Sequence, residues 1–177
     1  MKRLPNKLLL VCSILLLFTL IGCSEKTPSN TVVNSQLPEK KPSDFNFVLN
    51  YGVNAKNQLD TIKGTYTKDL VAAPSVTTPL KLSEKEMNEI YSRMKDINII
   101  SYPENFYPKS NMFKTPYDTY SIKIIANGKE KTINWKDESV SDSKEAVQLR
   151  GLFIKIHSIV SEKEEYKKLP RQTGGYD

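Results

Sequence analysis

The segment from Tyr120 to Lys136 predicts a β-hairpin whose register follows from the sequence alone. At its centre lies Asn127-Gly128, a dipeptide that favours a two-residue type I′ turn because both turn positions need a positive φ. Such a loop fixes three facing pairs, Ala126 with Lys129, Ile122 with Ile133, and Tyr120 with Trp135. The last two pairs fall on one face, apolar against apolar and aromatic against aromatic, and pairs of this kind stabilise a sheet. The turn and the pairing therefore predict the same hairpin.

Two amphipathic helices are predicted, one on each side of the hairpin in the sequence. The first covers about residues 84–97 and begins at a capping box formed by Ser83 and Glu86, with Leu82 and Met87 at the hydrophobic staple positions. The second begins at Asp142 or Ser143 and carries apolar residues at helical spacing. That stripe consists of Ala146, Leu149, Phe153, Ile156 and Val160, widened by Leu152 and Ile159.

The remaining strands are predicted near the start of the folded region. Phe45, Phe47, Leu49 and Tyr51 alternate with polar or smaller residues, which is the period of a strand with one buried face. Residues 61–68 predict a second strand after a loop at 52–57, and Pro74 and Pro79 bracket irregular chain. The expected fold is therefore α+β, a small antiparallel sheet of about four strands with two helices packed on one face.

The N-terminus predicts an export signal. A short basic segment precedes an uncharged apolar run over residues 8–21, which is typical of a secretory signal peptide. The run ends in Leu20-Ile21-Gly22-Cys23, which resembles the lipobox of bacterial lipoproteins. The resemblance implies cleavage after residue 22, a lipid on Cys23, and anchoring to the outer face of the cell membrane. Two acyl chains suffice for stable anchoring, whereas one binds only marginally.

Removing the predicted signal peptide changes the net charge and the cysteine count of the mature chain. Three of the basic residues, Lys2, Arg3 and Lys7, lie within residues 1–22, so the formal net charge falls from +6 to +3. Because lysines and acids interleave without a concentrated basic stripe, we expect no nucleic-acid partner. Of the two cysteines, Cys12 leaves with the signal peptide and Cys23 is blocked by lipid, so neither a disulfide nor a thiol site is expected.

The sequence predicts four regions along the chain. Residues 1–22 form the signal peptide, and residues 23–44, rich in Pro, Ser and Lys, form a lipidated cysteine with a disordered tether. Residues 45–170 form a single α+β domain, and residues 171–177 form a flexible tail.

Few residues suggest catalysis. His157 is the sole histidine and is interpreted as a partly exposed helix residue, not as a ligand or a catalytic base. Asp137, Glu138 and Asp142 cluster after the hairpin but lack the spacing of a calcium loop, so solvation of the loop and helix capping explain them better. No catalytic residue, metal site or cofactor is therefore expected.

The segment 102–118 is the strongest candidate for an interaction surface. It is a long connection dense in proline and aromatic residues, and long loops in compact domains are often functional. The residues proposed for this surface are Tyr102, Phe106, Tyr107, Phe113 and Tyr117. The alternative is that these rings fold back over the sheet and complete the core.

Three stretches, Leu59–Leu70, Asn134–Asp137 and Glu165–Pro170, resemble a group of uncharacterised lipoproteins from Gram-positive bacteria. That resemblance implies no activity. The leading expectation is a non-catalytic, membrane-anchored binding or accessory module that contacts a cell-envelope protein or polymer. The alternatives are an inhibitor or immunity protein, or an envelope hydrolase that uses carboxylates such as Asp60, Asp69 or Asp118.

Overall fold

The computed structural model describes residues 36–176. The predicted signal peptide at residues 1–22, the predicted lipidation site Cys23 and the tether up to residue 35 lie outside the described residues, as does residue 177.

The described residues build one sheet in which every neighbouring pair of strands is antiparallel. In chain order the strands are β1 (Asn46–Tyr51), β2 (Asn57–Asp60), β3 (Thr65–Lys68), β4 (Val76–Pro79), β5 (Thr119–Ala126) and β6 (Lys129–Lys136). Their order across the sheet is β4-β3-β2-β1-β5-β6, so the first four strands form a meander and the hairpin then adds to β1. The helices are α2 (Glu84–Asp96), α3 (Lys144–Ser161) and the short α4 (Glu164–Lys167), with 3-10 turns η1 (Val53–Ala55) and η2 (Ile99–Ser101).

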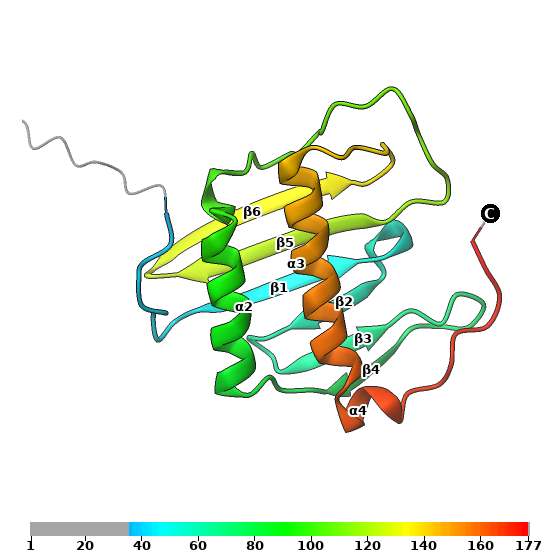
Figure 1. The fold of residues 1–177 in the computed structure, drawn as a ribbon. Helices are drawn as coiled ribbons and strands as arrows, with labels where there is room; N and C mark the ends of the chain where they lie inside the picture. The colour runs from blue at the N-terminus through cyan, green and yellow to red at the C-terminus, as the bar shows by residue number, and fades with distance from the viewer. Residues whose placement is uncertain (1–35, 177) are drawn as a thin grey trace, which may run out of the picture. The chain divides into compact units, whose positions relative to one another are not determined.

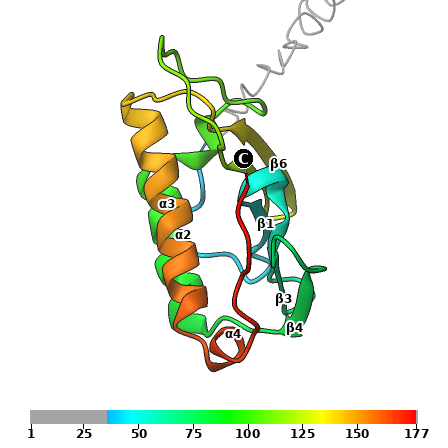
Figure 2. The same cartoon turned by 90° about the vertical axis from the view of Figure 1, so that its right-hand side faces the viewer.

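Two layers are visible from the side, with α2 and α3 together on one face of the sheet (Figures 1 and 2). The predicted α+β class and the placement of both helices on one face are confirmed. None of the helices within residues 36–176 combines the length and the apolar character needed to span a membrane.

The local signals that predicted the hairpin and the first helix are both present. The pairs Tyr120–Trp135, Ile122–Ile133 and Ala126–Lys129 face one another as expected, around a turn in which Asn127 and Gly128 have φ values of 54° and 69°. In α2 the Ser83 hydroxyl accepts from the amide of Glu86, while the Glu86 carboxylate accepts from the amide of Ser83. At the start of α3, Ser143 is the N-cap and accepts from the amide of Ala146.

The sheet has six strands, and the prediction of about four was too few. The segment expected to be one strand at 61–68 turns at 61–64, because the Asp60 carboxylate accepts from the amides of Ile62 and Lys63 and Gly64 adopts a φ of 65°. Asn57, expected to end the loop at 52–57, pairs together with residues 58–60 as β2 before that turn. The proline-flanked segment pairs as β4 at the sheet edge, where a proline removes no interior hydrogen bond.

The core lies between the sheet and the two helices. The alternating strand residues bury one face each, with Phe47, Leu49, Ile122 and Trp135 at most 1% exposed. The expected stripe of α3 is buried against them along its whole length. This packing leaves the loops at the two ends of the sheet as the places where functional side chains are displayed.

The contacts of the domain reach beyond the predicted range of 45–170. Leu37 is 7% exposed within the core, and the Tyr91 hydroxyl donates to the carbonyl of Pro38 at 2.7 Å. The Asp44 carboxylate accepts from the amides of both turn residues of the hairpin, and these bonds lower the pKa of Asp44. In the expected tail, Thr173 forms an isolated bridge with Val71. Both flanks were predicted from polar composition, which gives no information about such long-range contacts.

Candidate functional site

The aromatic segment 102–118 divides into a buried half and an exposed half. Tyr102 and Phe106 are 4% and 8% exposed, and both belong to the core. Phe106 packs edge-on against Trp135 with ring centroids 5.3 Å apart, and its amide donates to the carbonyl of Asn134 at 2.8 Å. The chain from residue 104 to 106 thereby pairs with the edge strand β6 at Asn134, which blocks that position of the edge from pairing with another chain. For these two residues, the core-completing alternative is the one that the structure shows.

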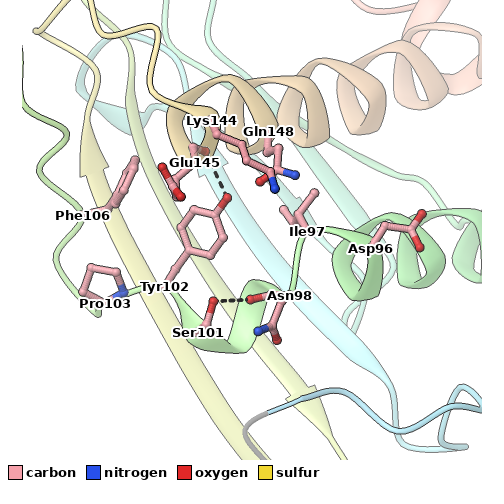
Figure 3. Close-up of a pocket in the computed structure, with 10 residues that line it drawn as sticks. All are labelled: Asp96, Ile97, Asn98, Ser101, Tyr102, Pro103, Phe106, Lys144, Glu145 and Gln148. Atoms are coloured by element: carbon pink, nitrogen blue, oxygen red, sulfur yellow. Dashed lines mark hydrogen bonds between the residues drawn. The ribbon is translucent and has the colours of Figure 1, made fainter.

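A pocket of about 270 Å³ shows how the buried half is used (Figure 3). It lies between the end of α2, the η2 turn and the first turns of α3. The Tyr102 ring forms its wall, and the Tyr102 hydroxyl donates to the carbonyl of Glu145 at 3.0 Å. Burial and the nearby Glu145 charge raise the pKa of Tyr102 to about 12. Tyr102 thus connects the loop to α3 and is not exposed for contact with a partner.

The exposed half forms an apolar tip. Tyr107, Met112 and Phe113 are 74%, 63% and 71% exposed, and Val140, which joins them from the loop after β6, is 47% exposed. The amide of Val140 donates to the carbonyl of Met112, and Phe113 forms an antiparallel bridge with Ser139. We call Tyr107, Met112, Phe113 and Val140 the aromatic tip. Tyr117, the last of the residues predicted for the surface, is half-buried outside it.

A buried ion pair holds the base of the aromatic tip. Asp137 is 1% exposed, and its two carboxylate oxygens accept from Arg150 Nη2 and Nε at 2.7 and 2.8 Å. Lys114, next to Phe113, donates to the same carboxylate at 3.0 Å, and its amide donates to the carbonyl of Glu138. The expectation that Asp137 solvates a loop was therefore wrong, because Arg150 lies on α3 and only the folded chain brings its charge to this position.

A second candidate site is a cavity of about 380 Å³ at the end of the sheet where β1 stops and β5 starts. Its polar lining comes from segments far apart in the sequence. These residues include Tyr51, Asp69, Asp118, Tyr120, His157 and Tyr176. Helix α3 and the C-terminal segment contribute to its walls together with the strand ends. We call this space the end cavity.

His157 lies within a chain of hydrogen bonds in the end cavity. Its Nδ1 lies 2.9 Å from the Tyr51 hydroxyl, which in turn lies 2.6 Å from the Tyr66 hydroxyl. Burial lowers the pKa of His157, and the charge of Lys68 acts in the same direction. The neutral imidazole is therefore the stable form at neutral pH. Burial raises the pKa of Tyr51 and of Tyr66, so both phenols stay protonated.

The carboxylates considered in the hydrolase alternative divide between two places. Asp60 is 4% exposed and accepts from the two amides of the 61–64 turn, so it has a structural role away from either site. Asp69 and Asp118 both line the end cavity. Asp69 accepts from the amide of Val71 and the hydroxyl of Tyr176, and Asp118 accepts from the hydroxyl of Tyr120 at 3.1 Å. Val71 holds its amide there with a φ of 65°, a conformation that β-branched residues rarely adopt.

Asp69 and Asp118 were candidate acids of the hydrolase alternative and His157 was considered separately, but the sequence did not predict that the three share a cavity. Their spacing carries no signal, because the cavity is assembled from five separate segments of the chain. For a metal ion, the described residues contain no group of three or more His, Cys, Asp or Glu side chains that could hold one. The two sites differ in what they offer, an exposed apolar surface in one and a half-open cavity with two carboxylates and a histidine in the other.

Comparisons with known proteins do not assign a function to either site. A scan against protein-family models and a search of the curated proteins found no match to this chain.

Proposed function

We propose that this chain is a lipid-anchored binding module on the outer face of a bacterial membrane, and that its aromatic tip contacts a protein of the cell envelope. The anchoring part of the proposal rests on the lipobox-like sequence ending at Cys23. The binding part rests on one observation, which is that three large apolar side chains of one loop are each more than 60% exposed. Exposed apolar patches on soluble domains commonly mark interaction sites.

The way the tip is held supports recognition of a partner. Its backbone is hydrogen-bonded to the loop after β6, and Lys114 connects it to the buried Asp137–Arg150 pair. A surface whose backbone is already ordered loses little conformational entropy on binding. Aromatic and methionine side chains are also enriched at protein interfaces. An apolar surface that is held by these contacts on an anchored protein therefore suits contact with another envelope protein.

Site-specific crosslinking in intact cells tests this proposal. A photoreactive phenylalanine analogue replaces Phe113 in the anchored chain, and the matched control carries it in place of Val147, which is 54% exposed on α3. We expect a protein adduct of one defined mass from position 113 and none from position 147. A second change, Tyr107→Ala, should reduce the yield of that adduct. Adducts of equal yield at both positions, or adducts with lipid alone at position 113, would contradict the proposal.

The hydrolase alternative gains one observation, because Asp69 and Asp118 line the same cavity. It is the weaker candidate, since a glycosidase-type mechanism needs one carboxylic acid that donates a proton. Here both groups are acceptors of tyrosine hydroxyl bonds, and burial with the Asp118 charge raises the pKa of the donor Tyr120. If purified protein released sugar or peptide fragments from cell-wall material, and Asp118→Asn abolished the release, the hydrolase would replace our proposal.

A further inference from the structure

The end cavity carries negative charge without a neutralising partner among the residues that line it. Asp69, which is 3% exposed, and Asp118 are its acidic lining residues, and no lysine or arginine lines it. Its single histidine is neutral at neutral pH, because burial and Lys68 lower the pKa of His157. The formal charge of the lining is therefore negative, on two carboxylates.

The buried carboxylates of Asp137 and Asp60 in the same domain are paired with cations. Asp137, at 1% exposure, has Arg150 at 2.7 Å and Lys114 at 3.0 Å, and Asp60 has Lys63 at 3.5 Å. Within residues 36–176, neither Asp69 nor Asp118 forms such an ion pair. Because a carboxylate removed from water without a cation is costly, the buried Asp69 in particular would be stabilised by a cation that enters the cavity.

Two lysines, Lys68 and Lys56, lie near the end cavity without lining it. Lys68 donates to the carbonyl of Pro170 at 2.9 Å and lies 4.7 Å from the centre of the Tyr166 ring, so its contacts are outside the cavity. Lys56 is exposed, and its Nζ donates to the Tyr176 hydroxyl at 2.9 Å while lying 4.9 Å from the centre of that ring. The hydrogen bond to Tyr176 raises the pKa of Lys56, and the charge of Asp69 acts in the same direction from a distance. The Tyr176 hydroxyl, held between Lys56 and the Asp69 carboxylate, thus links the two groups instead of a direct ion pair.

The carboxylates keep capacity to accept further hydrogen bonds. A carboxylate offers about four acceptor positions, whereas Asp69 uses two of them on Val71 and Tyr176, and Asp118 uses one on Tyr120. Those donors hold the carboxylates in place. An ammonium group has three donors and no acceptor, so it matches this arrangement better than a neutral hydroxyl or an anion does.

The remaining walls are aromatic and apolar. Tyr51, Tyr120, Phe153 and Tyr176 all line the space, and Tyr120 and Phe153 stack with ring centroids 4.4 Å apart. Aromatic faces attract cations, and apolar walls favour a ligand with a hydrocarbon body. A volume of about 380 Å³ is at the lower end for ligand sites, which restricts the ligand to a small molecule or one side chain.

We infer that the end cavity binds a small organic cation that carries one or two primary ammonium groups on a short apolar chain, with Asp69 and Asp118 as the anionic contacts. The class includes free diamines and the side chain of a lysine or ornithine residue. This site is separate from the aromatic tip and uses none of its residues.

Calorimetric titration of the full chain in detergent with 1,5-diaminopentane tests the inference. The control ligand is 1,5-pentanediol, which has the same carbon chain and no charge. We expect saturable binding of the diamine and none of the diol. Changing either carboxylate, Asp69→Asn or Asp118→Asn, should weaken diamine binding about tenfold or more, because each change removes a charged hydrogen bond. The matched control Asp142→Asn alters an exposed acid outside the cavity and should leave binding unchanged.

Two further measurements distinguish loss of the ligand site from loss of the fold and test the effect of the nearby positive charge. Asp69 is buried, so its variant is also examined by circular dichroism, and the half-buried Asp118 provides the second variant if the first fails to fold. Lys56→Gln removes the positive charge beside Tyr176 and should tighten diamine binding severalfold. Equal binding of the diol, unchanged affinity in a folded Asp118→Asn protein, or no binding of the diamine at about 10 mM would overturn the inference.

Discussion

The buried carboxylate of Asp137 should contribute more to stability than any surface ion pair of this domain. Its side chain is 2% exposed, that of Arg150 is 24% exposed, and the two form a bidentate pair. Asp137→Asn keeps the shape of the side chain but leaves the Arg150 charge without its anion. Removing one partner of a buried pair costs about 3–5 kcal/mol.

We expect the lower end of that range for Asp137→Asn. Arg150 keeps its bond to the carbonyl of Ser141 at 2.7 Å and its position 5.0 Å from the Trp135 ring. Lys114 is 41% exposed, so solvent screens its charge and its share is small. With a urea m-value of about 2 kcal/mol/M for a domain of this size, a loss of about 3 kcal/mol lowers the urea midpoint by about 1.5 M.

Urea unfolding followed by Trp135 fluorescence measures this change, and Asp142→Asn, in an exposed residue of the same loop, provides the control. A double-mutant cycle with Arg150→Met isolates the pair from its surroundings. The reasoning is refuted if Asp137→Asn shifts the midpoint by less than about 0.3 M, or if the cycle gives a coupling energy below about 0.5 kcal/mol.

Three other outcomes are expected. Cys23→Ser should move the protein from the membrane fraction to the soluble fraction of cell lysates, and retention at the membrane would contradict the lipid anchor. Leu37→Ala should lower the free energy of unfolding by about 2 kcal/mol, because Leu37 is buried in the core, and a change below about 0.5 kcal/mol would contradict this packing. The fold holds the pKa of His157 below its ordinary 6.5, so the native state binds fewer protons than the unfolded chain as the pH falls. The stability contributed by the neutral imidazole is therefore present above about pH 6.5 and is lost as the pH falls below that value. His157→Gln should flatten the profile of urea midpoint against pH over this range. A profile that the substitution leaves unchanged would rule out this contribution.

Elements with strong local signals were predictable. The hairpin was predictable because Asn127-Gly128 fixes a turn, and the turn fixes which residues face each other. Helix α2 was predictable because Ser83 and Glu86 satisfy backbone groups only three residues away. These interactions lie within a few residues of one another, so the local sequence contains them.

Elements that depend on a distant neighbour were not predictable in the same way. β2 and β4 are four residues each, with polar or proline-containing sequences, and their strand conformation depends on pairing with β1 and β3. The aromatic segment 102–118 was identified as a unit. Its division into core and surface depends on Trp135, which the buried half covers, and no spacing within the segment distinguishes the two halves.

The sequence by itself determined the α+β class, the two amphipathic helices and the hairpin, because periodicity, caps and turn preferences act over short distances along the chain. The tertiary structure decided three features that those signals cannot reach. It paired Asp137 with Arg150, it separated the buried Tyr102 from the exposed Phe113, and it placed Asp69 beside the same cavity as Asp118. Each of these depends on residues far apart in sequence meeting where charge and apolar surface are removed from water, and that environment exists only once the sheet and helices have packed together.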